Sequence, residues 1–303
     1  MQYFPLFLNT QRLNVLIVGA GEVACRKLDL LSRTEASIEV VAPEVCGGIL
    51  DYARAERITL QQRAVVDADL QHRDLVYIAT ANQSLNLQLA VQAKEAGAMV
   101  NVVDTPAACD FITPSIVDRG RLIVAISTAG AAPVFARDVR AKLEAMLPAS
   151  LTPLFDFIAS KRSEVQQRLT TGPERRRFWE RFFALNGEQF NGHTLQKYQQ
   201  SFANDIEHGE LLLLADNCPA EFLPLAALPL LQRIDAVVSI DDIPPAIAEL
   251  MRRDAERLEM LSNSELLKAW EIGQRLLLVL PVAEVERLKI AFPFAKHLRP
   301  GAI

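Results

Sequence analysis

Residues 1–128 alternate between two hydrophobic patterns. Short apolar runs typical of buried strands lie at Val15–Val18, Ile38–Val41, Ile58–Gln61, Leu75–Ala79 and Met99–Val102. Segments with helical spacing fall between several of these runs, notably Ala24–Ser32 and Leu85–Ala96. Strands that alternate with helices form largely parallel sheets whose two faces are covered. The pattern therefore predicts an α/β domain.

The pattern changes twice further along the chain. The stretch "FITPSIVDRGRLIVAIST" has two alternating runs around Asp118-Arg119-Gly120, which predicts a hairpin. After Pro133, helical spacing predicts helices over 134–147, about 153–169 and 174–185. From Gly209 onward, "GELLLLAD", "RIDAVVSID" and "RLLLVLP" are typical of buried strands, and "PPAIAELMRRDAERLEML" is typical of a helix. We therefore expect a helical region and then a small parallel α/β domain.

Composition and charge narrow the class of protein. Half of the 303 residues are apolar and the net charge is −5, which argues against nucleic acid as a general partner. The chain shows no leader and no long apolar run, so we expect a cytoplasmic protein that does not insert into membranes. The cysteines are scattered without a CxxC pair, and we expect free thiols and no bound metal: Cys25, Cys46, Cys109 and Cys218.

The stretch "NVLIVGAGEVACRK" joins the first predicted strand to the first predicted helix. Its spacing is Gly19-x-Gly21-x-x-Ala24. Gly19 would permit a sharp turn, Gly21 would let backbone N–H groups approach a pyrophosphate, and Ala24 would keep the helix close to the sheet. The same triplet also occurs in plain strand-to-helix turns, so the motif alone leaves both interpretations open.

Three other predicted strands end in residues suited to a site, because ligands of open α/β sheets bind beyond the carboxyl ends of the strands. Pro43 and Glu44 follow the second strand, where dehydrogenases place an acid for the adenosine ribose. Ala79 and Thr80 are small enough to let a nicotinamide lie close to the backbone. Asp104 follows the fifth strand as a candidate catalytic carboxylate, although an aspartate before Thr-Pro also caps turns.

Several motifs together resemble one known family. They lie within "YFPLFLNTQRLNVLIVGAGEVACRKLDLL", "NVVDTPAACDFITPSIVDRGRLIVAISTAGAAPVFARDVRAKLEAMLP" and "GPERRRFWERFF". Over residues 1–205 the chain resembles the N-terminal half of siroheme synthase, which is the precorrin-2 dehydrogenase and sirohydrochlorin ferrochelatase module. The resemblance favours the dinucleotide interpretation. It implies a Rossmann-like domain over 1–113, a hairpin and dimerisation region over 114–149 and a helical domain over 150–206.

The resemblance also implies a cofactor and a reaction. NAD would lie at Glu22–Val23 and Pro43–Glu44, and Asp104 would be the catalytic residue. Precorrin-2 would be oxidised to sirohydrochlorin, and ferrous iron would be the substrate of a second reaction. The family forms homodimers that exchange helices to complete each cleft. From the residues themselves we add Gly19, Gly21, Ala79 and Thr80 to the predicted cofactor site.

Basic and hydroxyl side chains are candidates for binding the substrate, because tetrapyrroles of this kind carry many carboxylates. Arg119, Arg137 and Arg140 are candidate clamps, although the last two also suit a solvated helix face. Ser127 and Thr128 could donate hydrogen bonds to carboxylates, or they could simply cap a turn. Thr128 matches the position of a serine that is phosphorylated in some family members.

The chain departs from the family at two places. The usual Ser-Ser-Gly-Gly-x-Ser-Pro loop becomes "STAGAAP" over 127–133. Residues 207–303 resemble the opening of a uroporphyrinogen methyltransferase, but the glycine-rich loop for S-adenosylmethionine becomes "ADNCPAE" over 215–221, without a glycine. We therefore expect a degenerate remnant without methyltransferase activity. These departures leave a second hypothesis open, a non-catalytic protein that binds tetrapyrrole or NAD and regulates or assists an enzyme.

Overall fold

The computed structural model describes residues 2–203 and 208–301. The chain divides into two compact units, Met1–Leu147 and Pro148–Ile303, each of which is described by itself. Short 3₁₀ turns supplement the helices and strands of both units, at Thr10–Arg12, Asp67–Leu70, Pro106–Ala108 and Ala220–Phe222.

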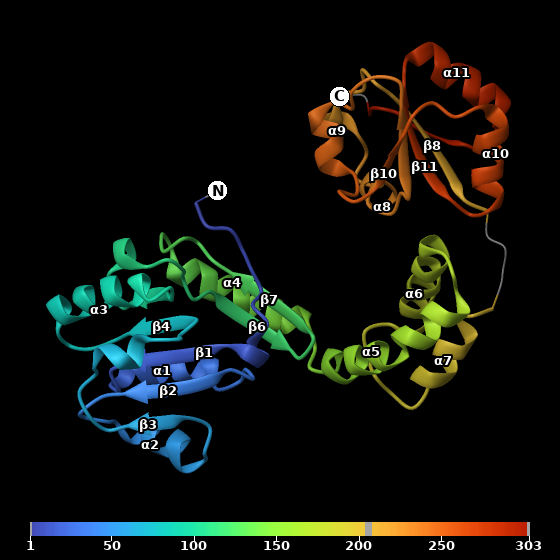
Figure 1. Cartoon of the computed structure of the whole chain (residues 1–303). Coiled ribbons are helices and arrows are strands. Elements are labelled where there is room, and N and C mark those ends of the chain that lie inside the picture. Colours follow the sequence, from blue (N-terminus) through green and yellow to red (C-terminus); the bar gives the residue numbers. More distant parts are fainter. Residues whose placement is uncertain (1, 204–207, 302–303) are drawn as a thin grey trace. The chain divides into compact units, whose positions relative to one another are not determined.

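A five-stranded sheet forms the centre of the first unit (Figure 1). Its strands are β1 (Asn14–Val18), β2 (Ser37–Val41), β3 (Thr59–Gln61), β4 (Leu75–Ile78) and β5 (Met99–Val102). Every pair is parallel, in the order β3-β2-β1-β4-β5. This is the strand order of the Rossmann fold, in which the chain winds outward from the first strand in both directions. The predicted α/β fold is confirmed.

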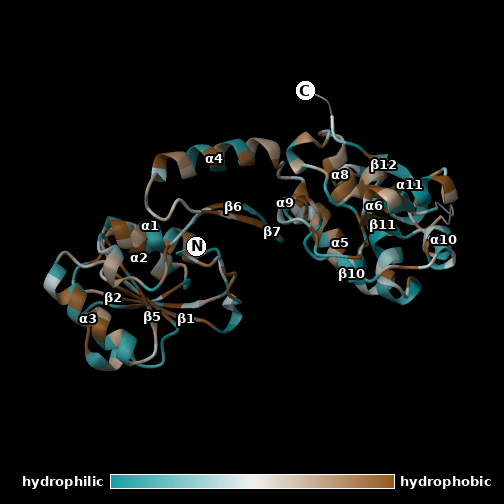
Figure 2. Cartoon of the chain, turned by 90° about the horizontal axis from the view of Figure 1, so that it is seen from above, coloured by the Kyte–Doolittle hydropathy of each residue, from teal (hydrophilic) through white to brown (hydrophobic). Residues whose placement is uncertain are grey.

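Both faces of this sheet are covered, as its continuous apolar strands require. Helices α1 (Glu22–Leu31) and α2 (Gly47–Arg54) pack on the face that carries Ile17, and α3 (Gln83–Glu95) packs on the face that carries Leu16. In Figure 2 the strands are mostly hydrophobic, whereas the helices carry polar residues as well. The ends of the predicted helices lie within two residues of the ends of α1 and α3. Helix α2 was not predicted, because Ile49 is its one buried residue.

The predicted hairpin is present after the Rossmann-like sheet. It consists of β6 (Ser115–Arg119) and β7 (Leu122–Ile126), and α4 (Pro133–Met146) packs against it. The loop 127–132 joins β7 to α4. Within this loop Ala129 and Gly130 both have positive φ, +53° and +83°. A residue with a Cβ is strained in this left-handed region, and Ala129 stands where the resemblance places a glycine.

The second unit begins with three helices, α5 (Leu151–Arg168), α6 (Gly172–Asn186) and α7 (Thr194–Gln200). Their core is aromatic. Tyr198 is fully buried, and its ring meets those of Phe157, Phe178 and Phe202 edge-on, with centroids 5.6, 5.4 and 5.3 Å apart. This burial raises the pKa of Tyr198. The helix of "GPERRRFWERFF" starts at a capping box in which Thr171 and Glu174 bond reciprocally.

A second five-stranded parallel sheet closes the chain, in the order β10-β9-β11-β8-β12. Its strands are β8 (Glu210–Ala215), β9 (Ala236–Ser239), β10 (Glu256–Leu258), β11 (Arg275–Leu280) and β12 (Lys296–Leu298). Leu212 and Leu214 face α8 (Ala227–Leu231) and α9 (Pro245–Leu250). Leu211 and Leu213 face α10 (Asn263–Glu271) and α11 (Val282–Ala291). The predicted small parallel sheet is present.

One helical prediction is wrong in its second half. The segment predicted as a single helix over 244–261 ends as a helix at Leu250 and continues into strand β10. The guanidinium of Arg252 donates to the carbonyl of Ile234, and Leu258 pairs with Val238 of β9. A three-residue edge strand is too short to show alternation, and Leu258, its one apolar residue, fits a helical stripe equally well.

The strained Ala129 leads to a stability prediction. Ala129→Gly should raise the free energy of unfolding of this region by about 0.5–1 kcal/mol, because glycine adopts the left-handed conformation without a Cβ clash. Ala131→Gly is the matched control: its φ is not positive, so it should destabilise the same loop. Hydrogen exchange of the β6 and β7 amides measures the local free energy of unfolding in both variants. Equal effects would contradict the strain at Ala129.

Candidate functional site

The residues that follow three strands of the first sheet, β1, β4 and β5, lie in one row. The N–H of Gly19 donates to Val41 O at 2.9 Å, that of Ala79 to Val18 O at 2.8 Å, and that of Val103 to Ile78 O at 3.0 Å. The ladder thus continues one residue past the strands. The glycine loop, the Ala79 loop and the Asp104 loop therefore share the carboxyl edge, and the first two flank the point between β1 and β4 where the winding reverses.

Gly19 is where two of these loops touch. Its φ is +101°, and a Cβ built on it would lie 2.5 Å from Ala79 O and 3.1 Å from Thr80 N. Only glycine has both the conformational freedom and the lack of side chain that this position requires. The contact therefore lets the β1 and β4 loops lie directly against each other, where a side chain would hold them apart.

Gly21 is the N-cap of α1 and, unlike Gly19, has open space where a side chain would lie. A Cβ built on Gly21 would meet no atom within 4 Å, and no side chain caps the helix. Glu22 and Val23 in the first turn are exposed, and Glu22 lies 3.8 Å from Arg26. Open N–H groups at a helix start attract a phosphate. The geometry of this loop therefore fits the pyrophosphate of a dinucleotide.

The two other predicted cofactor segments lie on either side of the glycine loop. Pro43 and Glu44 are exposed after β2, on the side where an adenosine ribose lies in Rossmann folds. On the β4 side, Thr80 is half-buried, and its hydroxyl accepts a hydrogen bond from Asn82 N at 3.2 Å. The buried amide of Asn86 donates to Thr80 O at 3.0 Å. The β4 loop is therefore held in a fixed shape beside the glycine loop.

Asp104 is exposed at the end of β5 and has a φ of +57°, a conformation that aspartate tolerates better than most residues. The chain then turns back along the free edge of β5. Asp110 N donates to Val100 O at 2.8 Å, the Asn101 amide donates to Phe111 O at 2.9 Å, and Cys109 Sγ accepts from Val102 N at 3.1 Å. The returning segment covers the sheet edge and fixes the loop that carries Asp104.

Lys27 is a further charged residue near Asp104 that the sequence analysis did not select. Its side chain leaves α1, its ammonium lies 3.4 Å from Thr113 Oγ1, and it lies 6.0 Å from the ring centroid of Tyr77. Partial burial lowers the pKa of Lys27, and the charges of Cys109 and Asp104 oppose that shift. The only signal in the sequence was its place as the last residue of the glycine-loop motif.

The predicted hydroxyl residues cap a turn. Ser127 Oγ accepts a hydrogen bond from Ala129 N at 3.0 Å, and Thr128 Oγ1 accepts one from Ala132 N at 3.1 Å. Both hydroxyls keep a proton to donate, so this capping does not exclude contact with a ligand. Both residues lie at the end of β7 that pairs with Ser115.

Arg119 lies at the other end of this hairpin, because it pairs with Leu122 beside the turn. Four strand positions, roughly 13 Å at 3.3 Å per residue, separate it from Ser115. Its guanidinium donates to Leu147 O, Glu144 O and Asp118 O at 2.7, 3.1 and 2.8 Å. The structure therefore does not bring Arg119 to the predicted site, because its donors bind the end of α4.

The other two predicted arginines lie on α4. Arg137 is exposed near the start of α4, directly after the 127–132 loop, whereas Arg140 lies 3.9 Å from Glu144 in an intrahelical pair. Of the three arginines, Arg137 alone follows the loop of Ser127 and Thr128 closely and has an exposed guanidinium.

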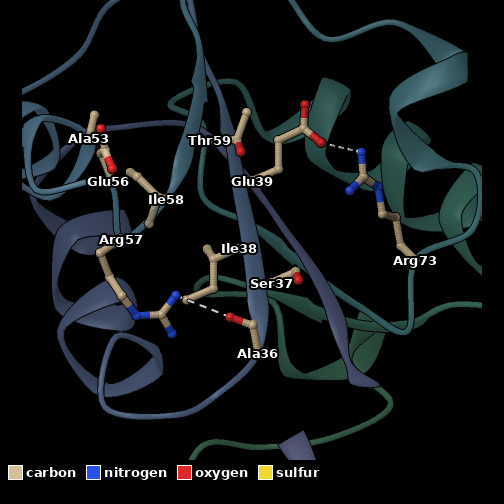
Figure 3. A pocket seen from close by; sticks show the side chains of 10 residues that line it. All are labelled: Ala36, Ser37, Ile38, Glu39, Ala53, Glu56, Arg57, Ile58, Thr59 and Arg73. Atoms are coloured by element: carbon tan, nitrogen blue, oxygen red, sulfur yellow. Dashed lines mark hydrogen bonds and ion pairs between the residues drawn. The ribbon is translucent and has the colours of Figure 1, made fainter. Parts of the chain in front are cut away.

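A pocket of about 520 Å³ lies at the opposite edge of the first sheet (Figure 3). Ser37 and Thr59, which begin β2 and β3, are part of its lining. Its cations are already paired: Arg57 donates to four backbone carbonyls around the end of α1, and Arg73 lies 2.5 Å from Glu39. This pocket is therefore not the candidate site.

The described residues contain no group of three or more His, Cys, Asp or Glu side chains arranged to hold a metal ion. None of the described helices combines the length and the apolar character that a membrane crossing requires. In the second unit, the segment after β8 has a buried Cys218 and runs into a 3₁₀ turn, at the place where the resemblance puts a glycine-rich loop.

Three family models match the chain in succession. Residues 6–115 match a model described as NAD(P)-binding, residues 119–146 match the sirohaem biosynthesis protein central region, and residues 150–194 match the sirohaem synthase dimerisation region. The match over residues 6–115 confirms the predicted nucleotide-binding domain.

Curated relatives cover most of this chain. A siroheme synthase of Pseudoalteromonas atlantica is 41% identical over 270 residues, which are 85% of this chain and 58% of that protein. A siroheme synthase of Thioalkalivibrio sulfidiphilus is 36% identical over 307 aligned positions, which are 97% of this chain and 63% of that protein. The chain therefore spans about three fifths of the length of these relatives.

A solved structure shares the fold. The protein named SirC, precorrin-2 dehydrogenase, aligns with a TM-score of 0.53 at 22% identity, and the match covers 65% of this chain and 98% of that one. Such a likeness supports the fold alone. Over residues 6–194 the chain is therefore similar, region by region, to an NAD(P)-binding domain and to the central and dimerisation regions of sirohaem synthases.

Proposed function

We propose that this protein oxidises precorrin-2 to sirohydrochlorin with NAD⁺, a step of siroheme biosynthesis. The observation that carries the proposal is the shared carboxyl edge. There the open glycine loop and the exposed Asp104 lie on either side of the β4 loop. A dinucleotide bound across this edge extends from the glycine loop towards Asp104.

The backbone around Gly21 would hold the pyrophosphate, and Pro43 and Glu44 would contact the adenosine ribose. Ala79 and Thr80 would lie against the nicotinamide half, because their loop is small and fixed by Asn86. Bound NAD⁺ supplies a hydride acceptor. The protein's part is to hold a ring carbon of the substrate against it and to exclude other orientations.

Asp104 is the proposed catalytic residue. The oxidation removes a hydride and a proton from the macrocycle, and an exposed carboxylate beside the nicotinamide can accept that proton or orient the ring. Insertion of ferrous iron, as a substrate, would displace two pyrrole N–H protons, and the same carboxylate could receive them. Ser127, Thr128 and Arg137 remain candidates for holding substrate carboxylates, and Arg119 is set aside because its guanidinium binds carbonyls at the end of α4.

A non-catalytic protein that binds tetrapyrrole or NAD is the second candidate, favoured by Ala129 in the altered loop and by the glycine-free segment 215–221. Anaerobic incubation with precorrin-2 and NAD⁺ separates the two. The enzyme produces NADH, measured by its absorbance, in step with sirohydrochlorin. Folded protein that binds NAD⁺ but yields no NADH would support the second candidate.

Gly21→Asp should weaken NAD⁺ binding by about 100-fold or more, because it places a negative charge where the pyrophosphate lies. The open space around Gly21 and its φ of −84° mean that the variant should fold normally. Calorimetry measures the affinity, and Gly21→Ala is the uncharged control, expected to lose less. Unchanged affinity in Gly21→Asp would make the loop a simple turn.

Asp104→Ala should lower turnover by about 100-fold or more, the usual scale for a positioned acid or base. Asp104→Asn keeps the shape and should lose as much, since the carboxylate is what reacts. NAD⁺ affinity should persist in both variants, because backbone groups elsewhere bind the cofactor. Near-normal dehydrogenation in either variant would make Asp104 structural.

The protein should be a homodimer through its helical region. Large apolar side chains are exposed there, including Leu185 at 44% and Leu195 at 53%, around the segment that matches a dimerisation model. Leu185→Asp should raise the dimer dissociation constant about 10-fold or more. Leu225→Asp, at an even more exposed site in the C-terminal domain, is the control. Light scattering reports the mass, and a monomeric wild type at micromolar concentration would contradict the prediction.

A further inference from the structure

We propose that Lys27 is a substrate-binding residue, whose ammonium holds a carboxylate of the tetrapyrrole beside Asp104. The inference rests on the proposed function, and it names the cation that recognises the substrate. It starts from the position of Lys27. The side chain comes from the helix of the glycine loop, yet it reaches towards the segment that follows Asp104, because its ammonium lies 3.4 Å from Thr113 Oγ1.

The ammonium of Lys27 has unused hydrogen-bonding capacity. It carries three N–H donors, and its described partners are the Thr113 hydroxyl, at a long distance, and the face of the Tyr77 ring. Among the described residues no carboxylate oxygen lies within 4 Å of it, since it forms none of the ion pairs found. Its environment also removes part of its hydration, which lowers its pKa. A partly desolvated cation without an ion pair favours an anionic ligand.

The neighbouring cations have partners of other kinds. Arg26, the adjacent residue, is exposed and lies 3.8 Å from Glu22, and Lys94 pairs with Asp110 at 2.7 Å. Arg119 binds the end of α4. Lys27, by contrast, reaches Thr113 in the segment that follows the Asp104 loop and forms no ion pair with the described residues.

The position of Lys27 favours a substrate carboxylate over a phosphate of the cofactor. Lys27 lies six residues beyond Gly21, roughly 9 Å along the helix axis at 1.5 Å per residue. The pyrophosphate is already served by the N–H groups at the helix start. The macrocycle must instead meet the nicotinamide near Asp104, and the Lys27 ammonium lies 3.4 Å from Thr113 Oγ1, in the segment that follows the Asp104 loop. A carboxylate arm of the macrocycle beside Asp104 also needs a cation to offset their mutual repulsion.

The test is an equilibrium titration with sirohydrochlorin, followed by its absorbance in the absence of NAD⁺. Lys27→Met keeps the length of the apolar stem and removes the charge. It should raise the dissociation constant about 10- to 100-fold, the range for one charge-assisted hydrogen bond. Lys27→Arg should stay within about 3-fold of wild type, because it restores the charge and the donors. Arg26→Met is the matched control and should bind as wild type does.

Two further measurements on the same variants are the NAD⁺ affinity and the steady-state kinetics. NAD⁺ affinity should be unchanged in Lys27→Met, and steady-state kinetics should show a raised KM for precorrin-2. Equal sirohydrochlorin affinity in wild type and Lys27→Met overturns the proposal, as does a parallel loss of NAD⁺ affinity, which assigns Lys27 to the cofactor. If the Lys27→Met variant does not fold, a Lys27→Gln variant that does fold is tested in its place. Wild type that binds sirohydrochlorin but forms no NADH overturns the oxidation alone, whereas wild type that binds none overturns both.

Discussion

The candidate site depends on one close contact, between the backbone of Gly19 and the carbonyl of Ala79. A Cβ at Gly19 would approach that oxygen to 2.5 Å, so any other residue would push apart the loops that follow β1 and β4. These loops lie at the point where the winding of the sheet reverses, and a parallel sheet places its ligand there. Because the ladder continues through Gly19, Ala79 and Val103, the same contact fixes the cofactor loop relative to Asp104.

The second constraint is the segment that returns along β5. A parallel sheet leaves unpaired N–H and C=O groups on its edge strand, and residues 109–111 bond to them. That arrangement solves a stability problem and also fixes the loop of Asp104. It places Thr113 where Lys27 can reach it. Edge protection and assembly of the site are thus achieved by one stretch of chain.

The C-terminal domain forms a complete parallel sheet without a glycine-rich loop after its first strand. Its five parallel strands are covered on both faces by helices, and Leu211 to Leu214 are almost entirely buried. Burial of apolar strands needs only the alternating pattern. Close approach of the backbone to a ligand needs glycines, and residues 215–221 contain none. The architecture of this domain therefore depends on its buried strands and not on a glycine-rich loop.

The sequence alone determined the five strands of the first unit, the helices α1 and α3, the parallel sheet and the row of strand-end residues, but it missed α2. These follow from hydrophobic period and glycine spacing, which are local properties. It also marked Gly19, Gly21 and Asp104 as candidates, because each lies just past the end of a strand or at the start of a helix. The 244–261 segment could not be predicted, since pairing with β9, and not local spacing, decides that Glu256–Leu258 is a strand.

Only the tertiary structure decided which charged residues are available to a ligand. Arg119 looked like a substrate clamp in the sequence, but its guanidinium is bound by carbonyls of a helix that begins many residues later. Lys27 looked like one more basic residue on a helix, yet Thr113, 86 positions away, sets its direction. Hydrogen bonds and desolvation depend on groups that folding brings together from distant parts of the chain. A charged residue therefore shows its type in the sequence and its role only in the folded protein.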